Sequence, residues 1–285
     1  MIRLVSSQEA QKDRLMKVAI VQLNSKTDKK KNLDIAIKLA NKAIASDKLD
    51  LIAFPEMISF YGGSDEDSKS SAEDIPNGET TERLAELARK NGVFVHGGSF
   101  CEKAGNKTFN TSLAFSREGE IVAQYRKIHL FDAAIPGGDS YRESDRVLPG
   151  DQVVTYQADG MTVGCTICYD LRFAELYLEL AKKGVDIIMI PAAFTLQTGK
   201  DHWLPLVRAR AIETQAYVLA PAQCGKFPDA KGGYRRTWGH SVIVDPWGHV
   251  VSQVPDGIGW VSATIDPDYI RKIRADMPIS SHRIL

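Results

Sequence analysis

Three residues with reactive side chains stand at the ends of mainly apolar segments that are far apart in the sequence. Glu56, Lys127 and Cys168 each follow a short run with the composition of a buried strand. The end of a strand is held rigidly by its sheet, yet it opens onto a cleft. A carboxylate, an amine and a thiol gathered in such a cleft could perform nucleophilic catalysis with acid–base assistance.

Cys168 is the candidate nucleophile. We expect a helix to begin shortly after it. The N-terminus of that helix would lower the pKa of the thiol from its usual value of about 8.5 and would offer backbone N–H groups to an oxyanion. The alternative is a buried structural cysteine at the end of a strand, and the residues alone leave both interpretations open.

Glu56 and Lys127 are the candidate acid–base groups. Glu56 follows the apolar run 51–55, which would partly desolvate its carboxylate and suit it to act as a general base. The alternative is a surface glutamate after a proline turn. Lys127 precedes the mainly apolar residues 128–131, an unusual neighbourhood for a solvating lysine, although a surface lysine with a buried stem remains an alternative.

Apolar periodicity predicts the elements that position these residues. The predicted strands span residues 17–23, 51–54, 93–100, 110–115, 121–125, 153–156, 161–167, 186–190, 217–222, 241–244, 250–254 and 260–265. The predicted helices span residues 31–45, 80–90, 172–183, 202–214 and 268–276, and long loops are predicted at 64–77 and 131–150. Buried strands that alternate with amphipathic helices indicate a layered α/β architecture.

Three predicted hairpins argue against a purely parallel sheet. Their turns lie at residues 117–119, 159–160 and 246–248. Two packed sheets with helices on the outside accommodate such antiparallel pairs better than one doubly wound sheet. Residues 1–15 read as a polar leader, and residues 16–285 as a single domain because no linker divides them.

The composition excludes several classes of protein. The chain has 285 residues, of which 44% are hydrophobic and 25% are charged, and its formal net charge is zero. A neutral chain lacks the basic excess of a nucleic-acid-binding protein. No apolar run is long enough to span a bilayer, and residues 1–15 lack the apolar segment of a signal peptide. We therefore expect no membrane partner and a cytoplasmic location.

Cysteine usage and motif searches argue against metal, disulfide and nucleotide chemistry. The chain has four cysteines, too few and too scattered for a disulfide framework. Cys165 and Cys168 form a C-x-x-C, but no second cysteine pair or spaced histidine pair completes a zinc site. The sequence also lacks a glycine-rich phosphate loop and a serine nucleophile elbow.

Taken together, the three candidate segments match a known pattern. Residues 54–56, 125–130 and 165–173 resemble the glutamate, lysine and cysteine motifs of the nitrilase superfamily of carbon–nitrogen hydrolases, in the same order and with similar separations. The resemblance runs from about residue 17 to residue 278. The sequence Cys-Tyr-Asp-Leu-Arg-Phe resembles the Nit branch of this superfamily. Within that branch, the chain is similar to deaminated glutathione amidases and ω-amidases in residues 208–215, 222–225, 239–241 and 245–248.

The resemblance implies a fold and an assembly. Members of the superfamily form a four-layer αββα sandwich, with two central mixed sheets flanked by helices, and this agrees with the pattern of predicted elements. Many members assemble as homodimers or larger homo-oligomers. No cofactor and no metal is implied.

The resemblance also implies roles for individual residues. Cys168 is the nucleophile that forms a thioester, Glu56 is the general base, and Lys127 with the backbone N–H of Tyr169 holds the oxyanion. Glu143 matches a second glutamate of the family, which would position the lysine or the substrate nitrogen. These roles describe an amidase that acts on a small-molecule amide.

Substrate selection has candidates of its own. Arg172 could pair bidentately with a substrate carboxylate, or it could form a structural ion pair with Asp170 or Glu175. Tyr61 and Phe194 could form pocket walls, although core packing is the commoner role of aromatic residues. We predict a small ω-amide acid as substrate. The alternatives are a nitrile or an N-carbamoyl compound, and a non-catalytic Nit-type interaction domain.

Overall fold

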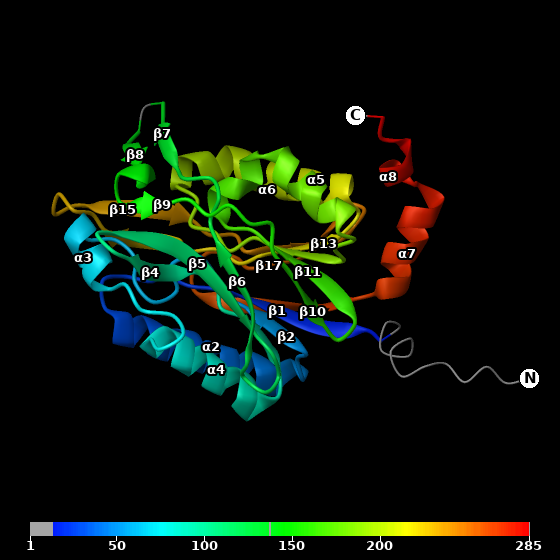
Figure 1. Ribbon diagram of the computed structural model, residues 1–285, viewed down its shortest axis with the longest axis horizontal. Coiled ribbons are helices and arrows are strands. Elements are labelled where there is room, and N and C mark those ends of the chain that lie inside the picture. The colour runs from blue at the N-terminus through cyan, green and yellow to red at the C-terminus, as the bar shows by residue number, and fades with distance from the viewer. Residues whose placement is uncertain (1–13, 137, 285) are drawn as a thin grey trace, which may run out of the picture.

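The computed structural model describes residues 14–136 and 138–284 and has four layers, with two sheets packed face to face between pairs of helices (Figure 1). The first sheet has the strand order β18-β1-β2-β3-β5-β4, and β6 and β9 also pair with β5. Its strands are β1 (Met16–Gln22), β2 (Leu51–Ala53), β3 (Phe94–His96), β4 (Phe100–Ala104), β5 (Lys107–Phe115), β6 (Ile121–Arg126), β9 (Val147–Leu148) and β18 (Gly259–Ile265).

The second sheet has the order β10-β11-β12-β13-β16-β17. Its strands are β10 (Thr155–Ala158), β11 (Met161–Cys165), β12 (Ile187–Met189), β13 (Tyr217–Ala220), β16 (Val242–Val244) and β17 (Val250–Gln253). The strands β11, β12 and β13 run parallel, whereas the outer pairs are antiparallel. The first sheet is mixed as well, since β1 pairs antiparallel with β18 and parallel with β2. The predicted αββα sandwich is confirmed.

The helices cover the outer faces of the sheets. On the first sheet lie α2 (Lys29–Asp47) and α4 (Glu79–Asn91), and on the second lie α5 (Ala174–Lys182) and α6 (Leu196–Thr214). The helix α4 ends in a left-handed cap, with Gly92 at a φ of +62°. At the C-terminal end, α7 (Pro267–Asp276) and α8 (Ile279–His282) follow β18. No described helix is long and apolar enough to cross a membrane.

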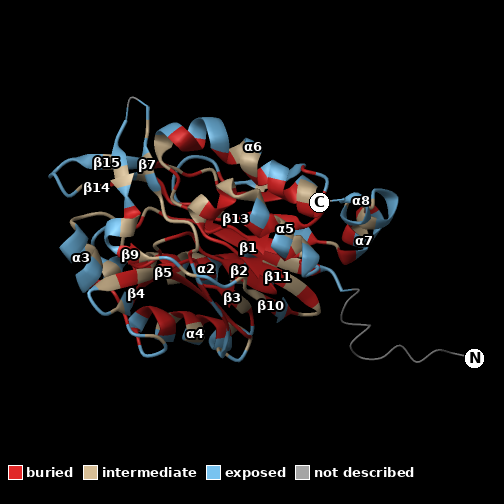
Figure 2. Ribbon diagram, turned by 45° about the horizontal axis from the view of Figure 1, so that its top comes forward, coloured by how far each residue is buried: buried red, intermediate tan, exposed pale blue. Residues whose placement is uncertain are grey.

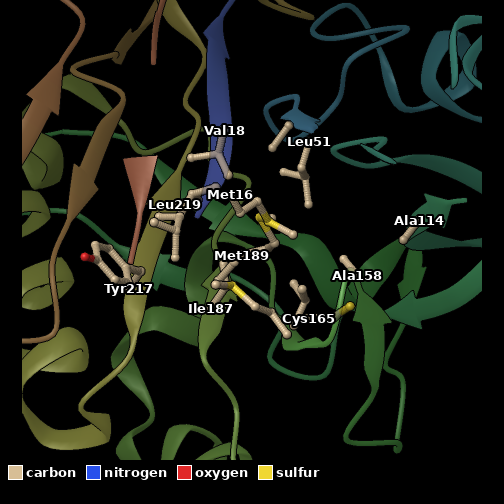
Figure 3. Packing of buried hydrophobic residues seen from close by; sticks show 14 of the residues in the cluster. Met16, Val18, Leu51, Ala114, Ala158, Cys165, Ile187, Met189, Tyr217 and Leu219 are labelled. Carbon is tan, nitrogen blue, oxygen red and sulfur yellow. The ribbon is translucent and has the colours of Figure 1, made fainter. Parts of the chain in front are cut away.

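Three apolar cores hold the layers together. The central core lies between the sheets, where Val18 and Leu51 of the first sheet face Ile187 and Leu219 of the second (Figure 3). An outer core lies between each sheet and its helices. Strands such as β1 and β2 are consequently buried on both faces, as Figure 2 shows, and this explains their nearly continuous apolar sequences.

Residues 64–77 were predicted to form a loop, but they contain the short helix α3 (Asp65–Ser70). Ser64 caps this helix, since its hydroxyl accepts from the backbone N–H of Asp67 while the Asp67 carboxylate accepts from the backbone N–H of Ser64. The acidic composition that we interpreted as a loop therefore stabilises the first turn of a helix.

The predicted strand 93–100 is wrong in extent, because Gly97 and Gly98 divide it into β3 and β4. Gly98 has a φ of +66°, and a Cβ atom there would lie 2.1 Å from the carbonyl oxygen of Pro55. Only glycine allows this approach. The turn between β3 and β4 thus packs directly against the segment that leads to Glu56.

Two short hairpins were not predicted. The segment 131–150 contains β7 (Asp132–Ala134) and β8 (Ser140–Arg142), followed by the 3₁₀ helix η1 (Glu143–Asp145). Residues 224–238 form a second hairpin of β14 (Cys224–Pro228) and β15 (Tyr234–Trp238). Neither hairpin belongs to the large sheets, so both lack the apolar periodicity that reveals a core strand.

Two helix boundaries also differ. The helix predicted at 172–183 is preceded by the 3₁₀ helix η2 (Cys168–Arg172), so α5 begins only at Ala174. The helix α6 begins at Leu196 rather than at residue 202, because Thr195 caps it by accepting from the backbone N–H of Thr198. Residues 1–13 of the predicted leader lie outside the described residues, and Arg14 pairs with Asp50.

Candidate active site

The three reactive residues lie together although they come from different sheets. Glu56 follows β2 and Lys127 follows β6, both in the first sheet, whereas Cys168 begins η2 after β11 of the second sheet. All three line one cavity of about 330 Å³, and Glu143 and Tyr61 line it as well. The sandwich therefore brings the three segments to one end of the interface between its sheets.

Glu56 is buried, with 4% of its surface exposed, and its neighbours fix the position of the carboxylate. Its Oε1 accepts a hydrogen bond from Asn110 Nδ2 at 2.9 Å and lies 3.3 Å from Lys127 Nζ. The Gln223 side chain donates to the backbone oxygen of Glu56 at 2.9 Å. Asn110 and Gln223 are positioning residues that sequence reasoning missed, because nothing in their local pattern marks an amide as part of a site.

Lys127 lies between two carboxylates. Its Nζ donates to Glu143 at 2.8 and 3.1 Å in addition to its contact with Glu56. The backbone N–H of Phe131 donates to Glu143 Oε2 at 2.6 Å and orients it. Burial alone would lower the pKa of Lys127, but Glu143 and Glu56 raise it well above its ordinary value. The amine therefore stays charged at neutral pH.

Cys168 has a strained backbone, with a φ of +49° in the left-handed region. Its backbone N–H donates to the carbonyl of Pro191 at 2.8 Å, which holds the turn in place. Non-glycine residues adopt this conformation rarely, and the strain typically costs about 1–3 kcal/mol. The turn presents the thiol to the cavity beside Glu56 and Lys127.

The expectation of a lowered thiol pKa is wrong. Burial raises the pKa of Cys168 well above its ordinary value, and the Glu56 carboxylate raises it further, whereas Lys127 and the backbone N–H of Ala193 lower it. The helix α5 begins at Ala174, so its N-terminus is separated from the thiol by η2. The thiol is therefore held protonated beside a carboxylate that can accept its proton.

A fully buried aspartate joins the lysine segment to the cysteine segment. Asp170 accepts hydrogen bonds from the Tyr125 hydroxyl at 2.7 Å and from the backbone N–H of Ile167 at 2.8 Å. It also contacts the backbone N–H of His129 at 3.0 Å and His129 Nδ1 at 2.7 Å. These contacts give His129 a structural role beside Asp170.

The predicted substrate-binding residues have different surroundings. Tyr61 lines the cavity, and its ring lies 4.2 Å from that of Phe227. Phe194 is buried in the core under α6, and neither it nor Arg172 is among the residues that line the cavity. Tyr169 follows the thiol directly in η2.

Arg172 is engaged elsewhere. Its guanidinium lies 5.7 Å from the Tyr169 ring centroid and 5.3 Å from that of Phe194, and it contacts His202 Nδ1 at 3.3 Å. Within the described residues no ion pair joins it to Asp170 or Glu175, the alternative partners that the sequence left open. Its contacts are those of a packing residue beside the turn that carries Cys168.

The thiols of the C-x-x-C lie in different surroundings. Cys165 is buried in the central core (Figure 3), whereas Cys168 lines the cavity. Burial raises the pKa of Cys165 to about 12, so this thiol stays neutral. All four cysteines are free, and the described part of the chain holds no cluster of three or more histidine, cysteine or acidic side chains able to bind a metal.

Comparison with known proteins reveals clear relatives. The carbon-nitrogen hydrolase family matches residues 17–275. The ω-amidase NIT2 of Xenopus tropicalis is 38% identical over 269 residues, which cover 94% of each chain. The deaminated glutathione amidase of Dictyostelium discoideum is 36% identical over 282 residues, which cover 96% of this chain and 95% of that protein.

A solved structure agrees with the sequence relatives. The NitFhit protein of C. elegans superposes with a TM-score of 0.87 at 35% identity over 95% of this chain. The chain spans 65% of the length of that protein. The predicted resemblance to the Nit branch of the nitrilase superfamily is thereby confirmed. The chain belongs to the carbon-nitrogen hydrolase family, and it hydrolyses carbon–nitrogen bonds other than peptide bonds.

Proposed function

We propose that this protein is an amidase without a cofactor, which hydrolyses the carboxamide of a small ω-amide acid to a carboxylate and ammonia through a thioester on Cys168. The observation that carries the proposal is the convergence of the Cys168 thiol, the Glu56 carboxylate and the Lys127 ammonium in one cavity. In the proposed mechanism these are a nucleophile, a base and an oxyanion-stabilising cation that line the same cavity.

The first half-reaction forms the thioester. Glu56 accepts the thiol proton while sulfur attacks the amide carbon, because a thiol with a raised pKa is not ionised beforehand. The oxyanion is held by Lys127 Nζ and the backbone N–H of Tyr169, and one such donor is typically worth about 3 kcal/mol. Glu56 then protonates the leaving nitrogen, the C–N bond breaks and ammonia departs.

The second half-reaction releases the acid. Glu56, again ionised, takes a proton from water while the oxygen of that water attacks the thioester carbon. The tetrahedral intermediate collapses with cleavage of the C–S bond, and the departing sulfur recovers its proton from Glu56. Glu143 serves both halves by keeping Lys127 charged and in place, as its 2.8 Å contact supports.

The substrate class is supported by cavity size and by the relatives. A cavity of about 330 Å³ suits a small molecule rather than a polypeptide. The similar proteins are named for ω-amides and deaminated glutathione. We propose the same class of acid-bearing amide here.

An ammonia-release screen tests the function. It compares glutaramate and deaminated glutathione with pentanenitrile and N-carbamoyl-β-alanine, and intact-mass measurement follows the acyl adduct on Cys168. We expect ammonia and an acyl adduct from the ω-amide acids alone. Faster turnover of the nitrile or of the carbamoyl compound than of the ω-amides would show that the protein is a nitrilase or an N-carbamoyl hydrolase instead. Tight binding of a partner protein without any adduct would favour the interaction domain.

We also propose that the protein works in a reducing, cytoplasmic compartment, and its four free thiols support this proposal. We further propose that it assembles as a homodimer or larger homo-oligomer. Light scattering of the purified protein at several concentrations tests the assembly. A mass that stays at 31.4 kDa throughout would contradict it.

A further inference from the structure

The cavity holds arginines besides the catalytic lysine, and the most buried of these is Arg235. Its side chain is 26% exposed, against 47% for Arg146 and 68% for Arg142. Arg146 pairs with Asp65 and Arg142 with Asp145, both at the outer rim. Arg235 is thus the cavity arginine whose charge is least screened by water.

The guanidinium of Arg235 has unused hydrogen-bond donors. Its buried Nε has no acceptor, and no hydrogen bond from this side chain is found within residues 14–136 and 138–284. The carboxylates of Asp139 and Asp229 lie 3.3 and 3.5 Å from Nε and form ion pairs with it, but neither accepts a hydrogen bond from it. A planar cation with free donors in a cavity wall is suited to bidentate pairing with a ligand carboxylate.

Contacts with aromatic residues hold Arg235 at the cavity. Its guanidinium lies 4.8 Å from the ring centroid of Tyr141 on β8. Its partner across the β14–β15 hairpin is Phe227, which packs at 4.2 Å against Tyr61 of the loop that follows Glu56. The hairpin is therefore anchored to the same loop that carries the base.

The hairpin is also fixed at its other end. The backbone N–H of Trp238 donates to the carbonyl of Phe194 at 2.9 Å. Gly199 of α6 packs so closely that a Cβ there would lie 2.2 Å from Trp238 Cβ. A side chain on such a hairpin is pre-organised, so binding a ligand requires little ordering.

We propose that Arg235 is the specificity-determining residue of this enzyme and binds the carboxylate of an ω-amide acid while its carboxamide lies against Cys168. The proposal rests on the amidase function proposed above and names the residue that selects the acid. Arg172, which the sequence pointed to for this role, stacks on Tyr169 and Phe194 instead.

A matched pair of substrates tests the role. Glutaramate and pentanamide have equally long chains and differ only in a terminal carboxylate or methyl group. We expect the wild-type protein to prefer glutaramate. A hydrogen bond between charged groups contributes enough binding free energy that Arg235→Met should lower kcat/KM for glutaramate by about 10- to 100-fold. The kcat/KM for pentanamide should change less than about threefold.

Three further variants serve as controls. Arg236 is the next residue on β15 and is exposed outside the cavity, so Arg236→Met should leave the preference unchanged. Arg235→Lys keeps the charge but loses the planar fork, so an intermediate preference is expected. Arg172→Met should not alter the ratio between the two substrates. Equal losses on both substrates in Arg235→Met, or a lost preference in Arg172→Met alone, would overturn the proposal.

Calorimetry separates this proposal from the amidase function. Glutaramate is titrated into Cys168→Ala protein with and without Arg235→Met, and we expect binding to weaken by about 10- to 100-fold in the double variant. If the wild-type protein releases no ammonia while this difference is found, the amidase function fails and the role of Arg235 stands. If the wild-type protein releases ammonia but the two variants bind glutaramate equally well, the amidase function stands and the role of Arg235 fails.

Discussion

At the residue scale, the site depends on the placement of two carboxylates around one ammonium. Glu56 and Glu143 contact Lys127 at 3.3 and 2.8 Å, and all three side chains are buried. Each carboxylate stabilises the charged amine, and the amine in turn offsets the cost of burying two carboxylates. Glu143 holds the ammonium in an ion pair, and under the proposed mechanism Glu56 is then the carboxylate that accepts and returns protons.

Replacing the nucleophile should abolish turnover without unfolding the protein. We expect Cys168→Ala to release no ammonia while its Tm stays within about 3 °C of wild type, because the substitution removes one sulfur atom. Cys224→Ala is the control, since it removes a free thiol that is buried and does not line the cavity. Undiminished ammonia release from Cys168→Ala would remove the thiol from the mechanism.

Removing the base should block both halves of the reaction. Glu56→Gln keeps the shape of the side chain but cannot accept the thiol proton, so we expect kcat to fall by about 10²- to 10⁴-fold. Intact-mass measurement should find no acyl adduct on Cys168, whereas loss of the second half alone would let the adduct accumulate. Glu118→Gln, at an exposed turn, is the control. An accumulating adduct in Glu56→Gln would show that another group accepts the thiol proton.

At the element scale, Asp170 joins the segment that carries Lys127 to the segment that carries Cys168. Its carboxylate accepts from Tyr125 on β6 and from Ile167 in the turn before Cys168. It also contacts His129. The strand that presents Lys127 and the turn that presents Cys168 belong to different sheets, so this buried side chain joins them across the interface.

Asp170→Asn should therefore weaken both stability and activity. The new amide nitrogen would face groups that are themselves donors, and a buried mismatch of this kind costs about 2–4 kcal/mol. Urea unfolding measures the loss, and ammonia release measures the displacement of the catalytic groups. Asp268→Asn on the surface of α7 is the control. Equal stability of the two variants would contradict the linking role.

At the scale of the whole molecule, the candidate site combines residues from both sheets, so it depends on an intact interface between them. His96 of β3 is fully buried there, and its ring contacts Ser112 of its own sheet at 3.0 Å and the Tyr156 hydroxyl of the opposite sheet at 3.4 Å. Burial lowers the pKa of His96 to about 3. The histidine is therefore neutral in the folded protein at every pH near neutrality.

This burial makes the sandwich sensitive to mild acid. The unfolded histidine binds a proton near pH 6.5 and the folded one does not, so stability present above about pH 6.5 is lost as the pH falls towards 3. By pH 5 the loss from this group is about 2 kcal/mol. We expect the free energy of unfolding in urea to fall less between pH 7 and pH 5 in His96→Gln than in wild type. His282→Gln, at an exposed position of α8, should retain the wild-type slope; a wild-type slope in His96→Gln would contradict the assignment.

Local sequence already determined the apolar frame of the molecule and marked three residues as candidates for the site. Strands such as β1 and β11 are buried by the opposing sheet, so their apolar runs are visible in the sequence. The end of such a run marks a position beside a cleft, and this pattern singled out Glu56, Lys127 and Cys168. The spacing of the motifs carrying them was enough to indicate the family.

Only the tertiary structure decided the surroundings of those residues. The pKa of Cys168 depends on burial and on Glu56, which is 112 positions away in the chain but adjacent in space, so no local rule for helix termini could predict its direction. The hairpin that carries Arg235 has no apolar face in the core, and Arg172 turned to its aromatic neighbours instead of the cavity. The burial, charge and contacts of a side chain depend on how the layers pack together. The sequence predicts them only where a single helix or strand determines them.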